Sequence, residues 1–507
     1  MAGQEQGVDA TDLARERAIQ AAWRLRPQFA GLSDFDRLVA NEFRPPAAQS
    51  AAEDAALRRL IAYAAAEIPY YRDLFAARGL TPGDIAAVAD LPRLPLLDKA
   101  AIRRNAVRLR PARLPRGERL YGVFTSSGTT GQPARILHTV RSNRMFSILA
   151  QRGYRWFRFD PLGSLAFIRL ASQLPRRRGQ PENPDGATVY MNRWRYVGSF
   201  FETGPWLGFN VTNPVEAQIA WLRAQRPRYL ATYSETLEHL CLATGGATPA
   251  ASIEATMAIS EQLTPSMRRR IERTFAAPVF QNYGLNEIGL VAVRCRAGRY
   301  HVHTEHCLVE VVDPSGNPVP PGRRGRIVVT ALNNAAMPLI RYDTDDLAEA
   351  VGGPCPCGRT LPGFGDILGR YSRIAYLPEG TLAAVGAVRT ALEEMPAELA
   401  APLRKFQLHQ DRDNRFTLRL GVVAPLPAAF AGRIRTAWGM AAGAHGWPLD
   451  IVEVAPEALV PGPGGKFQDF TSEHMPAPDD GDDGDDGDDG DDGDKGPGNA
   501  TRAQGST

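Results

Sequence analysis

A run of small polar residues is the first candidate for chemistry in this sequence of 507 residues. The run, Thr125-Ser-Ser-Gly-Thr-Thr-Gly-Gln-Pro133, follows the apolar stretch Tyr121-Gly-Val-Phe124. Its hydroxyls are donors, and its glycines let backbone N–H groups approach a ligand closely, as binding of a polyphosphate requires. No Gly-Lys-Ser/Thr follows, so the run is not a Walker loop, and a surface linker is the alternative. The residues predicted to contact phosphate are Ser126, Ser127, Gly128, Thr129, Thr130 and Gly131.

A carboxylate is predicted to face that run from the end of a strand. The apolar stretch that begins at Pro278 leads into a turn at Tyr283 and Gly284, which places Asn286 and Glu287 at the carboxyl end of the strand. Open α/β sheets bind their ligands at that edge. Glu287 is therefore a candidate ligand for Mg²⁺ on the phosphates.

Three further charged residues complete this candidate site. Pro338 to Leu347 is predicted to be a strand that runs into paired carboxylates, of which Asp346 can accept both hydroxyls of a ribose. Arg370, in Leu368-Gly-Arg370, offers a second polar contact to a nucleotide. Lys466 lies in the glycine-rich Pro461-Gly-Pro-Gly-Gly-Lys-Phe467, where a movable lysine can reach a developing negative charge.

Cysteine and histidine residues form a separate constellation. Cys295, His301, Cys355 and Cys357 offer three thiols and one imidazole, a standard tetrahedral set for Zn²⁺. Four protein ligands leave no open position, so we expect a structural zinc ion; loose surface thiols are the alternative. Rival ligands nearby are His303, His306 and Cys307, whereas Cys241 lies in an apolar helical stretch and is predicted to be a core residue.

Composition limits the class of protein. The chain is 44% hydrophobic and long enough for more than one domain. Its five cysteines argue against a disulfide framework. The stretch after Pro478 repeats Asp-Asp-Gly and holds eleven of the 56 acidic but only two of the 59 basic residues, so the remaining chain has an excess of twelve positive charges. That excess favours anionic ligands, and the acidic tail, residues 476–507, is predicted to be disordered.

The helices and strands expected to position these residues indicate an α/β fold. Residues 10 to 110 are predicted to be mainly helical, with a break at Ile68-Pro69. From residue 141 to 283, short apolar strands such as 164–169 and 229–232 alternate with helices such as 216–225 and 235–244, which indicates a layered sheet with crossover helices. Trp194, Tyr196, Phe200, Phe201 and Trp206 are predicted to form core, with the wall of an organic-acid pocket as the alternative.

Taken in order, these features resemble the adenylate-forming enzyme superfamily, and more closely its phenylacetate–CoA ligase branch. The resemblance extends from Ile68-Pro-Tyr-Tyr-Arg72 to Lys466. It rests on Asp90-Leu-Pro with Lys99, on Ser126 to Pro133, on Tyr283-Gly-Leu-Asn-Glu287 and on Pro338-Leu-Ile-Arg-Tyr342. The polar run paired with the Tyr-Gly turn at this separation is highly specific.

This resemblance implies a fold and a two-step reaction. A large N-terminal α/β domain with layered sheets and a helical N-terminal segment, residues 1–370, would bind ATP and a carboxylic acid. A small mobile α+β lid domain, residues 371–475, would carry Lys466. The acid would attack the α-phosphorus of ATP, giving an acyl-adenylate, and the thiol of coenzyme A would then displace AMP. Lys466 would bridge the acid and the α-phosphate, and Glu287 would hold Mg²⁺.

Two departures from the family pattern leave the acyl acceptor open. The acidic residues usual after Gly-Arg are replaced by Tyr371-Ser-Arg373, and the glycine-rich phrase that normally follows is absent. Alternatives to an aryl- or arylacetyl-CoA ligase are therefore an enzyme that transfers the acyl group to an amine or a carrier protein, and a silent relative that only binds nucleotide. We expect a cytoplasmic protein with a small-molecule acid as partner, without nucleic acid or membrane; a homodimer is compatible with the resemblance.

Overall fold

The computed structural model describes residues 19, 22–29, 38–125, 134–176, 186–259, 263–370, 377–460 and 469–474. The polar run from Ser126 to Pro133, the stretch after Arg370 that departs from the family pattern, Lys466 and the acidic tail all lie outside these ranges. Of the helices in the described ranges, none combines the length and the apolarity that crossing a bilayer needs.

Helices precede the sheets, as predicted. Helix α3 (Pro46–Glu67) ends before Ile68, whose backbone is extended, and α4 (Pro69–Ala77) begins at Pro69. Pro69 thus ends one helix and starts the next, because proline fits the first helical turn but not the interior. The buried stripe of α3, with Leu57 and Ile61, packs in one core with strands β9, β11 and β12. Short helices η2 (Pro82–Asp84), η3 (Val88–Arg93) and α5 (Lys99–Arg104) follow.

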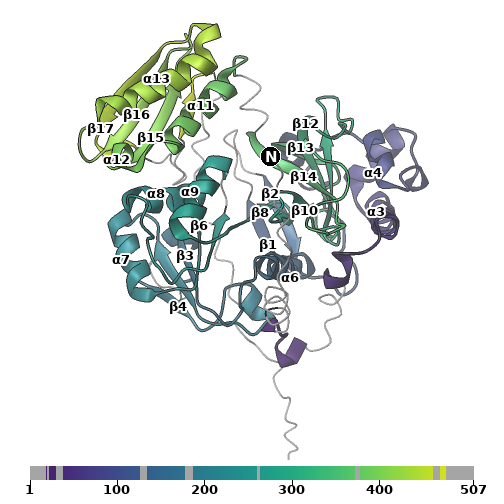
Figure 1. The fold of residues 1–507 in the computed structure, drawn as a ribbon. Coiled ribbons are helices and arrows are strands. Elements are labelled where there is room, and N and C mark those ends of the chain that lie inside the picture. The colour runs from purple at the N-terminus through teal and green to yellow at the C-terminus, as the bar shows by residue number, and fades with distance from the viewer. Residues whose placement is uncertain are drawn as a thin grey trace, which may run out of the picture.

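A twelve-stranded sheet forms the centre of the molecule (Figure 1). One half is parallel and orders β5 (Trp206–Asn210), β3 (Leu165–Arg169), β6 (Tyr229–Tyr233), β7 (Ala255–Ile259) and β8 (Val279–Leu285), with β4 (Val189–Met191) antiparallel at the edge. Crossover helices α7 (Val215–Gln225), α8 (Ser234–Ala243) and α9 (Pro265–Phe275) share a core with one face. Helix α6 (Val140–Trp156) contributes to the core on the other face, which confirms the layered α/β prediction.

The other half of the sheet is antiparallel. It contains β9 (Gly289–Arg294), β10 (Tyr300–Val302), β14 (Gly363–Arg370), β13 (Tyr342–Ala350), β12 (Arg324–Ala331) and β11 (Cys307–Val312). A separate hairpin pairs β1 (Leu120–Thr125) with β2 (Arg135–Thr139). The predicted strand from Pro338 is wrong in its bounds: β13 begins at Tyr342 and carries the carboxylates inside it, because Arg341 adopts the left-handed conformation with φ of 54°.

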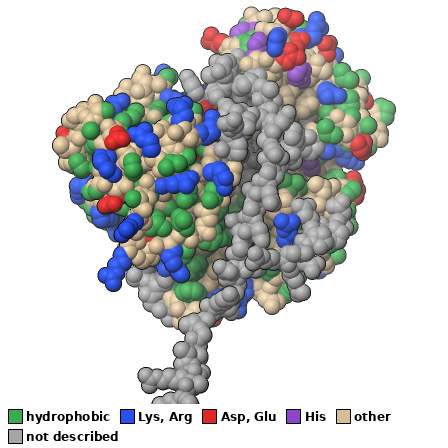
Figure 2. All heavy atoms as spheres, turned by 180° about the vertical axis from the view of Figure 1, so that it is seen from behind, with side chains coloured by type: hydrophobic (Ala, Val, Ile, Leu, Met, Phe, Trp, Pro, Cys, Tyr) green, Lys and Arg blue, Asp and Glu red, His purple; other side chains and the backbone are tan. Residues whose placement is uncertain are grey.

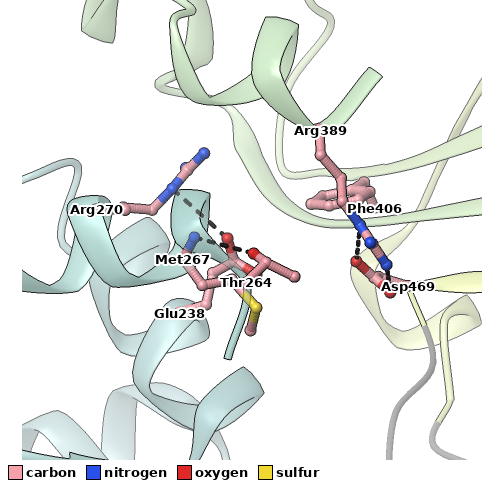
Figure 3. A pocket seen from close by; sticks show the side chains of 7 residues that line it. All are labelled: Glu238, Thr264, Met267, Arg270, Arg389, Phe406 and Asp469. Atoms are coloured by element: carbon pink, nitrogen blue, oxygen red, sulfur yellow. Dashed lines mark hydrogen bonds and ion pairs between the residues drawn. The ribbon is translucent and has the colours of Figure 1, made fainter. Parts of the chain in front are cut away.

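Residues 377–460 and 469–474 build a second sheet with its own core. The strand order is β17 (Leu449–Val454), β16 (Phe416–Val422), β15 (Leu403–Gln410) and β18 (Phe470–Ser472), with α11 (Thr381–Glu393), α12 (Ala397–Ala400) and α13 (Ala428–Ala442). It lies beside α8 and α9 (Figure 1). There, Arg270 Nη2 donates to Leu392 O at 3.3 Å, and its Nε lies 3.6 Å from Glu238 (Figure 3).

Charge is unevenly spread over the surface. Figure 2 shows Lys and Arg side chains over the lobe at the left, and more acidic side chains on the lobe at the upper right. Between Lys99 and Arg119 the chain has eight basic residues and one acidic residue, Glu118. This distribution is consistent with an anionic ligand.

Candidate functional site

The turn between β8 and β9 brings the predicted glutamate against the hairpin. Gly284 permits the close approach of the two strands, since a Cβ there would lie 3.1 Å from Gly289 O. Beyond it, Asn286 Nδ2 donates to Thr125 O at 3.1 Å. Thr125 is the last residue of β1 and the first residue of the polar run. The Asn286–Glu287 turn therefore lies where that run begins.

Glu287 has two partners from distant segments. Its side chain is only 6% exposed. Tyr342 Oη donates to Glu287 Oε1 at 2.6 Å, and Lys99 Nζ lies 3.7 Å from the same oxygen. A buried carboxylate needs such partners, because desolvation of its charge is costly. The pair holds Glu287 in one place at the carboxyl end of β8.

Lys99 is a site residue to which the sequence assigned no chemical role. A parallel bridge joins Leu97 to Tyr342: Leu97 N donates to Arg341 O at 2.9 Å, and Asp343 N donates to Leu97 O at 3.0 Å. This pairing delivers the first residue of α5 to Glu287. Burial keeps the pKa of Lys99 below its usual value, although the Glu287 carboxylate acts to raise that pKa.

Asp346 and Arg370 meet across neighbouring strands. They are direct partners in the pairing of β13 with β14, and Arg370 Nε lies 3.9 Å from Asp346 Oδ1. Tyr283 Oη donates to Asp346 Oδ2 at 2.6 Å. Burial raises the pKa of Asp346, against the lowering effects of Arg370 and the Tyr283 hydroxyl. The structure thus brings Tyr283, Asp346 and Arg370 together.

Arg341 is a buried arginine whose hydrogen bonds join the segments that carry the site residues. Its guanidinium forms two hydrogen bonds with Glu310, with Nε to Oε2 at 3.1 Å and Nη2 to Oε1 at 3.0 Å. It also donates to Leu94 O and Gly316 O, each at 2.6 Å. These bonds fix the chain just before Lys99 to strand β11, so Arg341 positions the site without reaching it.

The predicted cysteine and histidine set is assembled. The ligand atoms of Cys295, His301, Cys355 and Cys357 all lie within 4.8 Å of one another. The Cys295 and Cys355 sulfurs are 3.7 Å apart, and Cys357 Sγ is 3.3 Å from His301 Nε2. His301 Nδ1 lies 2.8 Å from Leu361 O, which leaves Nε2 as the nitrogen that faces the sulfurs.

The rival ligands have other partners. His303 Nδ1 lies 2.9 Å from Arg152 Nη1, and His306 Nε2 lies 2.7 Å from Ile288 O. Cys307 Sγ is 3.7 Å from Val291 O. Cys241 is buried in the core beside α7 to α9, as predicted. Among the described residues, only the Cys295 set therefore forms a metal-sized cluster.

The described part of the site suits a nucleotide with a cation. The buried Glu287 and the partly buried Asp346 lie in two hydrogen-bond groups, with Lys99 and Arg370 as their cationic partners. A carboxylate can hold a divalent cation, and a second carboxylate with an arginine can bind sugar hydroxyls. The predicted phosphate contacts, Ser126 to Gly131, and Lys466 lie outside the described residues.

Known proteins are similar to this chain over most of its length. A family model described as AMP-binding enzyme matches residues 206–337. The phenylacetate–coenzyme A ligase of Thermus thermophilus is 29% identical over 328 residues, which cover 63% of this chain and 70% of that protein. The phenylacetate–coenzyme A ligase of Escherichia coli is 26% identical over 368 residues, 69% of this chain and 75% of that protein.

A solved structure shares the fold. A 2-hydroxyisobutyryl-CoA ligase in complex with its acyl-adenylate superposes with a TM-score of 0.64 at 19% identity, over 86% of this chain and 91% of that one. The family model covers Glu287 but ends before Asp346 and Arg370. The chain is therefore similar to the AMP-binding enzymes, and the curated relatives that it matches are phenylacetate–coenzyme A ligases.

Proposed function

We propose that this protein activates a carboxylic acid with ATP to an acyl-adenylate and transfers the acyl group to coenzyme A. The products would be an acyl-CoA, AMP and pyrophosphate. The relatives named phenylacetate–coenzyme A ligase support an aryl or arylacetic acid as substrate. No observation on the described residues favours an amine or carrier-protein acceptor, or a silent relative.

One contact carries this proposal. The hydrogen bond from Asn286 Nδ2 to Thr125 O joins the Glu287 turn to the start of the polar run. It supports the proposal because it holds the turn with Glu287 beside Thr125, where the polar run begins, although the two segments are some 160 residues apart in the sequence. If the run were only a surface linker, the position of the buried Glu287 beside its first residue would have no explanation.

The roles follow from the chemistry of each group. Glu287 would hold Mg²⁺, which neutralises charge on the phosphates of ATP. Tyr283, Asp346 and Arg370 would hold the nucleoside, with Asp346 accepting from the ribose hydroxyls. Gly284 and Asn286 would shape the turn. Lys466, in its glycine-rich loop, would stabilise charge where the acid attacks the α-phosphorus, and Ser126 to Gly131 would donate to the phosphates.

Release of pyrophosphate tests the function. Purified protein is given ATP, Mg²⁺ and a panel of aryl and arylacetic acids, with and without coenzyme A, and both pyrophosphate and thioester are measured. Thioester formed only with coenzyme A supports the ligase. Pyrophosphate without thioester supports an amine or carrier-protein acceptor, and neither product with any acid would contradict the proposal. Lys466→Ala should abolish pyrophosphate release without unfolding the protein.

We propose further that the Cys295 set holds a structural Zn²⁺. The geometry supports this, because two sulfurs at about 2.3 Å from a tetrahedral zinc ion lie about 3.8 Å apart, close to the 3.7 Å between Cys295 and Cys355. The bond from His301 Nδ1 to Leu361 O is the type of support that orients a histidine ligand. The zinc ion would join β9 and β10 to the Cys355–Cys357 turn.

Metal analysis decides the zinc proposal. Wild-type protein should contain one zinc ion per chain, and Cys355→Ser should lose it and unfold at a lower temperature. Cys241→Ala is the matched control, since it removes a thiol from a different core. Wild-type protein free of zinc, with Cys355→Ser fully stable, would refute the proposal.

A further inference from the structure

A row of side chains continues one face of the parallel sheet to its carboxyl edge. Leu165 and Phe167 of β3 and Tyr229 and Ala231 of β6 belong to the core that α6 shares. Because side chains alternate along a strand, the next residue on the same face is Arg169 in β3 and Tyr233 in β6. The Arg169 guanidinium lies over the Tyr233 ring, 5.6 Å from its centroid. A cation thus ends a row that is otherwise apolar.

Helix α6 connects this edge to the Glu287 turn. Gly153 lies against Phe280 of β8. Phe146 is seven residues earlier, on the same side of the helix and about 10 Å along it. A Cβ at Gly289, two residues after Glu287, would lie 3.8 Å from Phe146. The Phe146 ring also contacts the Tyr196 ring, with centroids 5.2 Å apart.

Tyr196 has an unusual backbone for its residue type. Its φ and ψ are 64° and −75°, and Val197 N donates to Arg195 O at 2.9 Å, which makes a rare, strained γ-turn. Such strain is concentrated at functional sites. Tyr196 is also 41% exposed, whereas Trp194, Phe201 and Trp206 of the same aromatic stretch are buried. Those three are core, as predicted, but Tyr196 is not.

A second arginine and an amide complete the group. The Arg195 guanidinium lies 4.8 Å from the centroid of Tyr196. Its Nη1 donates to Gln173 O at 2.7 Å, and Tyr233 Oη donates to Gln173 Oε1 at 2.7 Å. Gln173 belongs to η4 (Ala171–Gln173), directly after β3. Within the described ranges, no carboxylate forms an ion pair with Arg195.

We propose that Arg169, Gln173, Arg195, Tyr196 and Tyr233 bind the distal end of the acid substrate, and that this end carries a second anionic group, such as a carboxylate. The proposal rests on the proposed function. Phe146 and Tyr196 suit an aromatic ring, and two guanidiniums suit an anion beyond it. Arg169 lies on the third strand from β8, about 14 Å away at about 4.8 Å per strand. A benzene ring substituted opposite its reacting arm spans more of that distance than phenylacetate does.

A purely structural role explains these residues less well. Stacking of arginine on tyrosine stabilises many exposed surfaces modestly. It does not account for a strained, half-exposed tyrosine beside Phe146, nor for two cations at the ligand-binding edge of a parallel sheet. An apolar acid would offer the Arg195 guanidinium no complementary charge.

Matched acids test the proposal. Pyrophosphate release is measured with 4-carboxyphenylacetic acid and with 4-methylphenylacetic acid, and the ratio of their kcat/KM values is the readout. Wild-type protein should prefer the carboxylated acid about tenfold or more, and Arg169→Met should lower this ratio about tenfold or more, as loss of a charged hydrogen bond predicts. Arg72→Met removes an exposed arginine on α4 and should keep the ratio.

The outcomes distinguish failure of this proposal from failure of the proposed function. A ratio of kcat/KM values near one in the wild type, or an unchanged ratio in Arg169→Met, would overturn the proposed binding of a second anionic group. Pyrophosphate release with any acid would still support the proposed function. If Arg169→Met unfolds, Arg195→Met carries the same test from a separate segment. If no acid releases pyrophosphate, the proposed function fails. Binding by the five residues would still be supported if the carboxylated acid, but not the methyl acid, stabilised the protein against thermal unfolding. Equal stabilisation by the two acids would overturn the proposal.

Discussion

Glu287 depends on a hydroxyl that the surrounding fold supplies. Tyr342 donates to its Oε1, and both burial and Glu287 raise the pKa of Tyr342 well above its usual value, so the hydroxyl stays protonated and remains a donor. Tyr342→Phe should lower pyrophosphate release about tenfold or more, because a hydrogen bond to a charged group is worth about 1.5–3 kcal/mol. The loss should be largest at low Mg²⁺ concentration, which a titration with Mg²⁺ measures.

Tyr63→Phe is the control for that change. It removes a tyrosine hydroxyl that donates to Ala335 O at 2.9 Å, away from Glu287. Its activity should stay close to that of the wild type. Equal activity of Tyr342→Phe and wild type across the Mg²⁺ titration would remove the hydroxyl from the mechanism.

His138 makes stability depend on pH. Burial lowers the pKa of His138 to about 4, against 6.5 for a free imidazole. Between these pKa values the unfolded chain binds a proton that the folded chain does not. The free energy of unfolding is therefore unaffected by His138 above pH 6.5 and decreases as the pH falls toward 4. The effect is on the order of 1–3 kcal/mol. Urea unfolding of His138→Asn should show a shallower loss of stability over this range than the wild type; parallel curves would contradict the assignment.

The residue types at the site could be predicted, but their partners could not. Glu287, Asp346 and Arg370 stand in local motifs whose chemistry is visible in the sequence. Lys99 and Tyr342 reach Glu287 through the bridge between Leu97 and Tyr342, which joins segments some 240 residues apart. Pairing at such separation depends on the tertiary fold, and no periodicity in a single sequence reports it.

Helix α6 shows how an element depends on one small residue. Gly153 has no room for a side chain, since a Cβ would lie within 2.8 Å of Phe280 Cε2. Gly153→Ala should therefore push α6 away from β8 and destabilise the protein by about 1–3 kcal/mol. Adding Phe280→Leu should recover part of that loss. Thermal or urea unfolding of the single and double variants measures the coupling.

Gly432→Ala is the matched control for α6. Gly432 lies in α13 and is exposed, and a methyl group added there would have open space around it to a distance of 4 Å. The same substitution there should stabilise the helix by about 0.5–1 kcal/mol. If both glycine substitutions changed stability alike, close packing of α6 on β8 would not explain Gly153.

The bounds of helices and strands could be predicted where one hydrophobic periodicity continues through the whole element. They could be predicted less well where the backbone conformation changes within it. Strands β3 and β6 and helices α7 and α8 match their predicted ranges within a residue or two, because each is an uninterrupted apolar or amphipathic stretch. The strand predicted from Pro338 starts four residues later, at Tyr342. Arg341 and Asp345 both have positive φ, of 54° and 66°, and a non-glycine residue in that conformation leaves no reliable mark on a sequence.

At the scale of the whole molecule, the second sheet has a core separate from the cores around the large sheet. The core of the second sheet contains residues from 384 to 470, among them Phe416 and Trp438, and none from the large sheet. The two parts meet at α8 and α9, where Arg270 joins Glu238 to the end of α11 (Figure 3). Interfaces of this polar kind permit relative motion of domains. A lid that moves after adenylation requires such a boundary.

Independent folding of the second sheet tests that boundary. Residues 377–475 produced alone should unfold in one cooperative thermal transition, because their apolar core is complete within the fragment. The partly buried Arg389–Asp469 pair also stays intact, with bonds of 2.8 and 2.6 Å, and it ties α11 to the residue before β18. Circular dichroism and calorimetry would report this transition. A fragment without cooperative unfolding would show that the sheet depends on α8 and α9, and a lid that swings as a rigid unit would then be excluded.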